Sequence, residues 1–246
     1  MDRLSAMAAS GIRTRMESLD LLANNIANAS TSGFKADREF YNLYTSAEAL
    51  EDGADVPASH PVVEKHWTDF AQGALTPTAN PLDVALSGSG FFGIQGTSGP
   101  VYTRNGNFRI GTTGQLETTD GYAVRGQNGK PIVLNSSKSV TITADGSVIQ
   151  DATAVGRLEI VNFQSPDHLT KLGNTYFQMN DVSAVAKAAT GAKVQQGILE
   201  SSNGAPAEQA VRLVSVMRQF EMLQRAVSIG TDMNKKAIDE VARVNG

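Results

Sequence analysis

The sequence predicts a mixed α and β protein in which long N- and C-terminal helices form a coiled-coil-like domain around an inserted, mainly antiparallel β domain. Two observations predict this. Each end of the 246-residue chain carries an apolar stripe at helical spacing, and the middle combines short strand patterns with many glycine turns. Because the stripes lie outside the middle domain, we expect them to form surfaces for neighbouring helices.

The predicted domain boundaries follow these changes of pattern. Residues 45–60 are small and acidic, which predicts an exposed excursion, and residues 62–69 and 195–200 are expected to be extended. In chain order the predicted segments are an N-terminal helix with its motif (1–35), an extended connection (36–81), the β domain (82–182), a return connection (183–203) and the C-terminal helix (204–246).

The N-terminal helix is predicted to end by about residue 30. Asn, Ser and Thr side chains compete for backbone hydrogen bonds from Asn24 onward, and Gly33 supplies the left-handed conformation that commonly terminates a helix. Arg15 occupies a position of the apolar stripe where an apolar residue is preferred. The stripe consists of Ala8, Ile12, Leu19, Leu22 and Ile26, with Leu4 and Met16 beside it.

The β domain is predicted from short strand-like segments between Leu82 and Met179, which are residues 83–86, 91–95, 101–104, 107–110, 116–118, 122–125, 132–133, 140–143, 148–149, 156–162 and 175–178. Asparagine-glycine and aspartate-glycine pairs favour tight hairpin turns, because both positions tolerate positive φ. Four such pairs, at 105–106, 120–121, 128–129 and 145–146, punctuate these segments. This spacing favours a compact antiparallel barrel or a sandwich-like domain.

The C-terminal helix is predicted from a stripe with alternating three- and four-residue spacing, typical of a coiled-coil seam. Pro206 suits the first helical turn, where its missing N–H costs nothing, and Glu208 complements the positive end of the helix dipole. The stripe runs through Leu213, Val216, Phe220, Leu223, Val227, Gly230, Asn234, Ala237, Val241 and Val244.

Composition excludes several classes of function. A net charge of −4 without a basic cluster gives no electrostatic footprint for nucleic acid, so no nucleic-acid partner is expected. The absence of cysteine excludes disulfides, cysteine-ligated zinc and a cysteine nucleophile. No cationic segment followed by an apolar one opens the chain, which predicts the absence of a cleaved signal peptide. A cytoplasmic protein and one exported by an unusual route both fit.

Candidate chemical sites are weak. Gly88, Gly90 and Gly93 match a dinucleotide-binding G-x-G-x-x-G, but the residues after Gly93 cannot begin the helix that the pyrophosphate needs. The histidines lack zinc-protease or triad spacing. We therefore predict no catalytic, cofactor-binding or metal-ligating residues and no small-molecule substrate, although paired carboxylates for glycoside chemistry would leave no sequence signature.

The terminal stripes have two explanations. One is an ordinary helix hairpin within a single chain that packs on the β domain. The other is that the stripes are completed by other subunits, because ordering long terminal helices costs more backbone entropy than their stripe residues return. We favour the second explanation, and it predicts that both ends fold fully only on assembly.

Three motifs resemble those of the bacterial flagellar axial proteins, a family that includes rod, hook and hook-associated proteins. They are the run from Asn24 to Lys35, the pair of stretches 80–92 and 102–108, and the run from Gly197 to Asn203. The order of the motifs and the size of the middle domain are similar to the FlgF and FlgG type of rod protein. Residues 1–2, 29–31 and 81–86 favour FlgF.

The resemblance implies a structural subunit of the flagellar basal-body rod, a hollow, periplasm-spanning drive shaft that transmits torque to the hook. It implies assembly with itself and with other rod and hook proteins, and export by the flagellar type III apparatus. Asn24 and Asn28 are expected to fix helix register or to cap the helix. The alternatives are another axial protein, such as a distal rod or hook subunit, and a secreted β-domain enzyme or binding module with a helical oligomerisation arm. The residues assigned to the subunit interface are Leu4, Ile12, Leu19, Leu22, Asn24, Asn25, Ile26, Asn28, Phe34, Leu213, Val216, Phe220, Leu223, Val227, Val241 and Val244.

Overall fold

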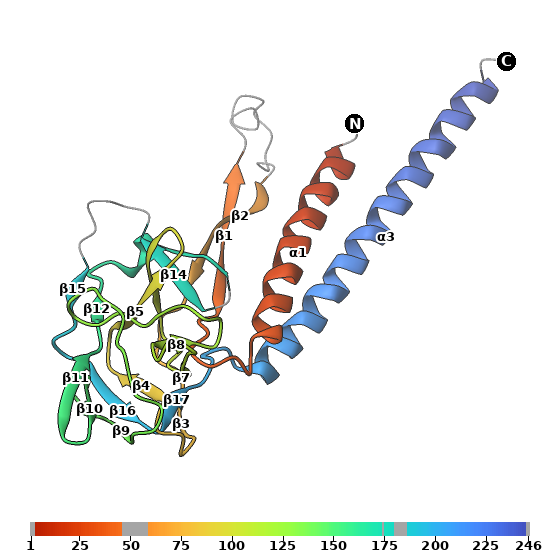
Figure 1. Ribbon diagram of the computed structural model, residues 1–246. Coiled ribbons are helices and arrows are strands. Elements are labelled where there is room, and N and C mark those ends of the chain that lie inside the picture. The colour runs from red at the N-terminus through yellow and green to blue at the C-terminus, as the bar shows by residue number, and fades with distance from the viewer. Residues whose placement is uncertain (1–2, 46–58, 174, 180–185, 245–246) are drawn as a thin grey trace. The chain divides into compact units, whose positions relative to one another are not determined.

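The computed structural model describes the chain except for residues 1–2, 46–58, 174, 180–185 and 245–246 (Figure 1). Its contacts divide the chain into two compact units. The helical unit comprises Met1–Ala27, Asp37–Trp67 and Pro206–Gly246, and the β unit comprises Asn28–Ala36 and Thr68–Ala205. The predicted mixture of terminal helices and a β-rich middle is confirmed.

The helical unit contains α1 (Arg3–Ala27) and α3 (Pro206–Val244), which run antiparallel and side by side (Figure 1). Helix α3 begins at Pro206 with Glu208 in its first turn, as predicted. Both helices are formed within one chain, and their complete folding only on assembly stays a prediction.

The helical unit also contains most of a two-stranded sheet of β1 (Asp37–Thr45) and β2 (Ser59–Thr68). Strand β2 confirms the extended segment predicted over 62–69. Strand β1 was missed because residues 36–44 show no clean two-residue alternation that would mark a half-buried strand. The excursion predicted over 45–60 lies mostly outside the described residues.

The β unit is built around a six-stranded sheet in which every neighbouring pair is antiparallel. Its central hairpin joins two strands that the sequence predicted, and its outer strands come from later in the chain. In spatial order the strands are β13 (Leu169–Lys171), β14 (Tyr176–Met179), β6 (Gly99–Thr103), β5 (Phe91–Gly96), β12 (Ile160–Asn162) and β15 (Lys187–Ala188).

Smaller antiparallel sheets complete the β unit, with a short 3₁₀ helix at Pro166–His168. In these sheets, β4 (Val84–Ser87) pairs with β16 (Lys193–Gln196), β3 (Leu75–Pro77) with β17 (Ile198–Glu200), β7 (Phe108–Ile110) with β8 (Leu116–Thr118), and β10 (Ser147–Gln150) with both β9 (Val140–Ile142) and β11 (Thr153–Arg157). The segments predicted as strands at 122–125 and 132–133 make only isolated bridges.

Two apolar clusters fill the β unit. In the larger cluster, the rings of Phe92 and Phe108 meet edge to face with centroids 5.4 Å apart. In the smaller one, Phe91, Phe163 and Phe177 form edge-on or tilted ring contacts. Strand β5 supplies neighbouring residues to both clusters, because successive side chains of a strand point to opposite faces. The glycines before Phe91 therefore precede a strand that is buried on both faces.

The glycine turns differ in detail from the prediction. Gly121, Gly129 and Gly146 have positive φ, and each donates its N–H to the carbonyl three residues earlier, whereas the preceding Asp or Asn has negative φ. These are type I turns closed by a left-handed glycine rather than turns with positive φ at both positions. Glycine is required at position 106 for space, because a Cβ there would collide with the backbone of Val84.

The β unit also extends beyond the predicted boundaries of 82–182. It takes in Asn28–Ala36, assigned above to the terminal motif, and the two segments assigned as connections beside it. The reason is strand pairing: β3 and β17 pair with each other, and β16 pairs with β4. Residues that look like linkers in the sequence are thus part of the β unit.

Candidate functional site: a buried ion cluster and the terminal helices

The three motifs of the sequence meet at one buried carboxylate, that of Glu200 in the β unit. Its Oε1 lies 2.5 Å from Nζ of Lys35, and its Oε2 lies 3.2 Å from Nη1 of Arg104. The side chains of Lys35 and Glu200 are 0% exposed and that of Arg104 is 4% exposed. Each of the two cations therefore depends on the carboxylate of Glu200, because water does not solvate them.

Backbone groups supply one further partner to each member of this ion cluster, while the buried Nε of Arg104 has no hydrogen-bond partner among the described residues. Lys35 Nζ donates to the carbonyl of Ala71 at 2.6 Å, and Arg104 Nη2 donates to that of Gly88 at 2.8 Å. The Gly73 N–H donates to Oε1 of Glu200 at 3.0 Å. The guanidinium of Arg104 lies 5.4 Å from the centroid of the Phe91 ring, a cation–π distance.

Burial controls the electrostatics of the ion cluster. Loss of solvent lowers the pKa of Lys35, and the charge and hydrogen bond of Glu200 oppose that shift. Burial likewise lowers the pKa of Arg104, again against the influence of Glu200. The single carboxylate is thus the group that allows two cations to remain buried.

The segments that lead to the two helices leave the β unit side by side. The Gly33 N–H donates to the carbonyl of Glu200 at 2.7 Å, and the Ala36 N–H donates to Oδ1 of Asn203 at 2.8 Å. Asn203 Nδ2 donates to the carbonyl of Asp69 at 2.6 Å. A carboxamide thus joins three backbone segments, and we call Gly33–Ala36 with Glu200–Asn203 the seat.

Phe34, assigned above to the subunit interface, is buried within the seat. Its ring lies under Nζ of Lys171, which is 4.4 Å from the ring centroid and donates to the carbonyl of Lys35 at 2.8 Å. The side chain is therefore not available to another subunit in this conformation. Sequence reasoning classed it with the helix because it follows the helical motif directly.

The three asparagines assigned to the subunit interface lie in different environments. Asn25 is buried and closes a two-bond ring with the backbone of Asp37: its Nδ2 donates to the carbonyl at 2.8 Å, and its Oδ1 accepts from the N–H at 3.0 Å. Asn24 is exposed on α1. Asn28 lies one residue past the end of α1, and its Oδ1 accepts from Thr31 Oγ1 at 3.3 Å. The side-chain amide of Asn25 thus connects α1 to the first residue of β1.

The buried face of α1 is not the apolar stripe that the sequence suggested. Leu22 is buried, but Ile12, Leu19 and Ile26 are only half-buried. Small and polar residues replace them, and the hydroxyls of Thr14 and Ser18 donate to backbone carbonyls one turn earlier, each at 3.1 Å. The row that we call the inner row of α1 is Gly11, Thr14, Ser18, Leu22 and Asn25.

The predicted stripe of α3 is the less exposed side of that helix. Val216 is buried, and Leu223 lies beside α1, where a Cβ on Gly11 would come within 3.2 Å of it. Leu213, Phe220 and Val227 are half-buried on the same row, the inner row of α3. Leu4, Val241 and Val244 have side chains outside the described residues.

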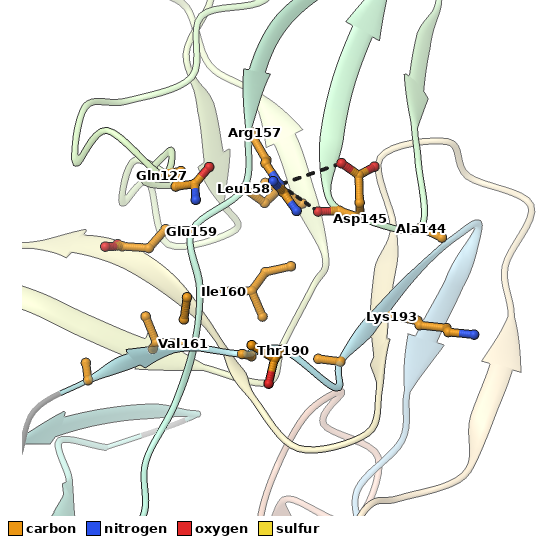
Figure 2. Close-up of a pocket in the computed structure, with 14 residues that line it drawn as sticks. Gln127, Ala144, Asp145, Arg157, Leu158, Glu159, Ile160, Val161, Thr190 and Lys193 are labelled. Carbon is orange, nitrogen blue, oxygen red and sulfur yellow. Dashed lines mark hydrogen bonds and ion pairs between the residues drawn. The ribbon is translucent and has the colours of Figure 1, made fainter.

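A groove of about 650 Å³ in the β unit is a candidate for small-molecule chemistry (Figure 2). Several alanines and Ile160 line one part of it. Arg157 reaches across to Asp145, donating from Nε to its carbonyl at 2.9 Å, and Glu159 pairs with Arg125 at 2.6 Å. These charged groups stabilise the walls of the groove, and we assign it no reaction.

The hydrogen bonds of Asp145 predict the pH range in which its carboxylate is protonated. Hydroxyl groups of Thr143 and Ser147 donate to its carboxylate and lower its pKa to about 2. The stability that this exposed carboxylate contributes is present above its unfolded-state pKa and is lost as pH falls through the lowered value. We expect the carboxyl ¹³C shift of Asp145 to stay that of the ionised form at about pH 3, where an unperturbed Asp is mostly protonated.

The matched variant for this titration is Thr143→Val, which removes the first donor. It should raise the apparent pKa of Asp145 towards the ordinary value. A wild-type Asp145 that titrates together with the other exposed aspartates would contradict the prediction.

Among the described residues, no group of three or more His, Asp or Glu side chains is placed to hold a metal ion. No described helix combines the length and the apolar character needed to span a bilayer.

Comparison with known protein families gives three matches along the chain. Residues 5–35 match the model of the flagella basal body rod protein, and residues 85–150 match the D1 domain of the flagellar hook protein FlgE/F/G. Residues 195–240 match the C-terminal model of the flagellar basal body rod FlgEFG protein. Lys35, Arg104 and Glu200 fall one in each match, so the ion cluster joins the three matched segments of the chain.

Full-length relatives agree with these matches. The chain is 30% identical over 250 residues to the flagellar basal-body rod protein FlgF of Caulobacter vibrioides, with 100% of both chains covered. It is 34% identical over 222 residues to FlgF of Salmonella typhimurium, covering 84% of this chain and 85% of the relative. It is 30% identical over 249 residues to FlgG of Caulobacter vibrioides, covering 92% and 94%. Identity of this extent over the whole length shows that the chain belongs to the flagellar basal-body rod proteins of the FlgF/FlgG type.

Proposed function

We propose that this protein is a structural subunit of the flagellar basal-body rod, of the FlgF type, and that it assembles through α1 and α3. The observation that carries the proposal is the antiparallel pair formed by the two ends of the chain, whose inner rows meet at Gly11 and Leu223. The names of the relatives support the same role. The three- and four-residue spacing of the α3 row supports coiled-coil-like packing with further helices.

The seat supplies what a subunit of a rotating shaft needs. Torque passes through a subunit only if the chain segments that lead to its helices are held firmly. In the seat, the backbone of Gly33 bonds to Glu200 and that of Ala36 bonds to Asn203, so both connections to the helices start from one hydrogen-bonded block. A buried ion cluster with backbone partners resists deformation, because each partial opening leaves a charge without a partner.

The remaining features of the proposal are supported by the likeness to the rod family. The terminal helices line the inner tube, and the chain is exported through the flagellar apparatus without cleavage of a signal peptide. Its partners are other copies, other rod proteins and the hook. It is not an enzyme; the pairing of Asp145 with Arg157 and of Glu159 with Arg125 supports a structural reading of its groove.

Deletion of the gene tests this function. We expect the deletion strain to be non-motile, with flagella that fail to extend beyond the inner membrane, because a missing rod subunit leaves no surface on which the next subunit can assemble. Electron microscopy of isolated basal bodies is the measurement, and complementation with the full chain is the control. A deletion strain with complete rods and hooks would refute the proposal.

A further inference from the structure

Asn203 of the seat stands directly before a glycine, in a residue pair that is chemically unstable. The backbone nitrogen of the glycine can attack the side-chain carbonyl carbon of the asparagine, and the amide is then lost as ammonia. Glycine permits this ring closure because it has no side chain and its backbone adopts many conformations. The chain contains such pairs at 105–106, 128–129, 203–204 and 245–246, of which the last lies outside the described residues.

Asn203 differs from the other two described asparagines in the use of its side-chain nitrogen. Its Nδ2 donates to the carbonyl of Asp69 at 2.6 Å and to that of Ala71 at 3.1 Å. Asn105 and Asn128 use their Oδ1, which accepts the N–H two residues later at 3.1 Å and 3.0 Å. A carboxylate oxygen makes such a local turn bond equally well, but it has no proton to donate. Loss of the amide nitrogen therefore removes structural hydrogen bonds at Asn203.

Either product of deamidation at position 203 is incompatible with the closed seat. With aspartate, the carbonyls of Asp69 and Ala71 would face an anionic oxygen in place of a donor. With isoaspartate, the main chain gains one carbon at the residue whose N–H donates to the carbonyl of Phe34 at 3.3 Å. The first product loses the side-chain bonds of the seat, and the second displaces its backbone bonds.

The charged groups around this position do not offset the loss. Lys35 donates to the same Ala71 carbonyl at 2.6 Å and to Glu200 at 2.5 Å. Lys171 donates to the carbonyl of Lys35 at 2.8 Å. The carboxylate of Asp69 accepts the Ala71 N–H at 2.9 Å, so it adds negative charge to the same turn. Both ammonium groups already have acceptors, and neither can neutralise a new carboxylate without weakening a bond of the seat or the ion cluster.

The closed seat also slows the reaction. Oδ1 of Asn203 accepts the Ala36 N–H at 2.8 Å, and Nδ2 is held by its two carbonyls. The attacking nitrogen belongs to Gly204, which is buried and donates to Oγ of Ser202 at 3.2 Å. Ring closure turns the asparagine side chain towards that nitrogen, so these bonds must open together first. The reaction therefore belongs to the chain with an open seat.

We propose that Asn203 is a self-modification site of the open chain, and that deamidation there produces a chain that cannot close the seat. The nitrogen of Gly204 bonds to Cγ of Asn203, the bond from Cγ to Nδ2 breaks, and Nδ2 leaves as ammonia with the Gly204 N–H proton. Water then adds to one carbonyl carbon of the succinimide ring and opens it to aspartate or isoaspartate. No atom changes its oxidation state. The proposal rests on the seat alone and is independent of the proposed rod function.

Peptide mass spectrometry of the full chain tests the protection. The protein is incubated at mildly alkaline pH, either folded or in urea, and trypsin then places Asn105, Asn128 and Asn203 in three different peptides. In urea the three should lose their amides at similar rates. Folding should slow the reaction of Asn203 by at least about tenfold, because several hydrogen bonds must open together, and that of the exposed Asn128 by less. An Asn203 that reacts as fast in the folded protein as in urea would overturn the proposal.

Refolding of the aged protein tests whether a modified chain closes the seat. Chains kept in urea are diluted into buffer, and brief proteolysis removes those that do not fold. Chains deamidated at Asn203 should be depleted about fivefold or more among the survivors, because two carbonyls of the seat have lost their donor. Chains deamidated at Asn128 should survive in their starting proportion. Equal survival of the two modified forms would refute the effect on the seat.

Two variants separate the amide from the act of unfolding. Asn203→Asp should unfold at a lower urea concentration than Asn128→Asp, which keeps its turn bond. Gly204→Ala should fold as wild type, because its Cβ would make only ordinary contacts at 3.5 Å and the φ of Gly204 lies outside the left-handed region. Its side chain hinders ring closure, so it should keep the Asn203 amide in urea and refold fully after ageing. A Gly204→Ala protein that keeps the amide but refolds as poorly as aged wild type would contradict the proposal.

Discussion

Replacing Glu200 with alanine is expected to lower the free energy of unfolding by about 3 to 5 kcal/mol, the cost of breaking a buried ion pair from one side. The variant leaves Lys35 and Arg104 buried without the carboxylate that contacts both in the wild-type protein, at 2.5 Å and 3.2 Å. It also removes the acceptor of the Gly73 N–H. Urea unfolding of the full chain, followed by near-UV absorption and circular dichroism, measures the loss.

The matched control is Asp151→Ala, which breaks an ion pair with Lys138 of similar length, 2.7 Å, between side chains that are about half exposed. It should cost less than about 1 kcal/mol, because water replaces the lost partner. The triple variant Lys35→Met, Arg104→Met, Glu200→Leu should recover much of the stability, since it removes the buried charges together. A Glu200→Ala protein as stable as the Asp151→Ala protein would contradict this account of the ion cluster.

The loss in the Glu200→Ala variant should depend on pH. Burial lowers the pKa of Lys35 in the folded protein, and removing Glu200 removes the main influence that opposes this shift. The unfolded chain then binds a proton that the folded chain does not, so stability rises as pH increases from the lowered folded-state pKa towards the ordinary lysine value. We expect the deficit of the variant relative to wild type to shrink at alkaline pH. A deficit that grows there would show that the cost does not come from a buried ammonium.

Replacing Gly33 with alanine is expected to cost about 2 to 5 kcal/mol, from two effects that add. Gly33 has a φ of 70°, a conformation that costs a residue with a Cβ about 1 to 2 kcal/mol. The new Cβ would also collide with the backbone of Arg104 and Asn105, and overpacking of this kind costs about 1 to 3 kcal/mol. The collision pushes the terminal motif away from the middle motif and so opens the seat.

Gly121→Ala is the control that isolates the backbone effect. Gly121 has a φ of 88°, and a Cβ there would find nothing within 4 Å. This variant should lose only about 1 to 2 kcal/mol. Both losses of unfolding free energy are measured in the same urea experiment. Equal losses would show that glycine is needed at position 33 only for its positive φ, and not for the close contact between the motifs.

The Glu200→Ala and Gly33→Ala variants should also affect assembly more than their stability alone explains. The seat holds the chain segments that lead to α1 and α3, so opening the seat loosens the start of both segments. We therefore expect Gly33→Ala cells to swim less well than Gly121→Ala cells at equal amounts of folded protein.

Local patterns determined much of this protein. The start of α3 at Pro206, the inner row of α3, the extended segment ending at Glu200 and most strands of the β unit follow from periodicity, turn residues and helix-start signals. These features depend on residues within one or two turns of each other, which is why a sequence alone reveals them. The family resemblance came from the same short runs.

Tertiary structure alone decided the ion cluster and the buried face of α1. Lys35 and Glu200 are 165 residues apart and Arg104 and Glu200 are 96 apart, so no local pattern links them. The only signal was that Lys35 and Glu200 each directly follow apolar residues within a motif. On α1, Gly11 and hydroxyls bonded to their own helix allow α3 to approach closely, and this closeness outweighs the more apolar neighbouring row. Burial is decided by which surfaces fit together, and the sequence records only how apolar each surface is.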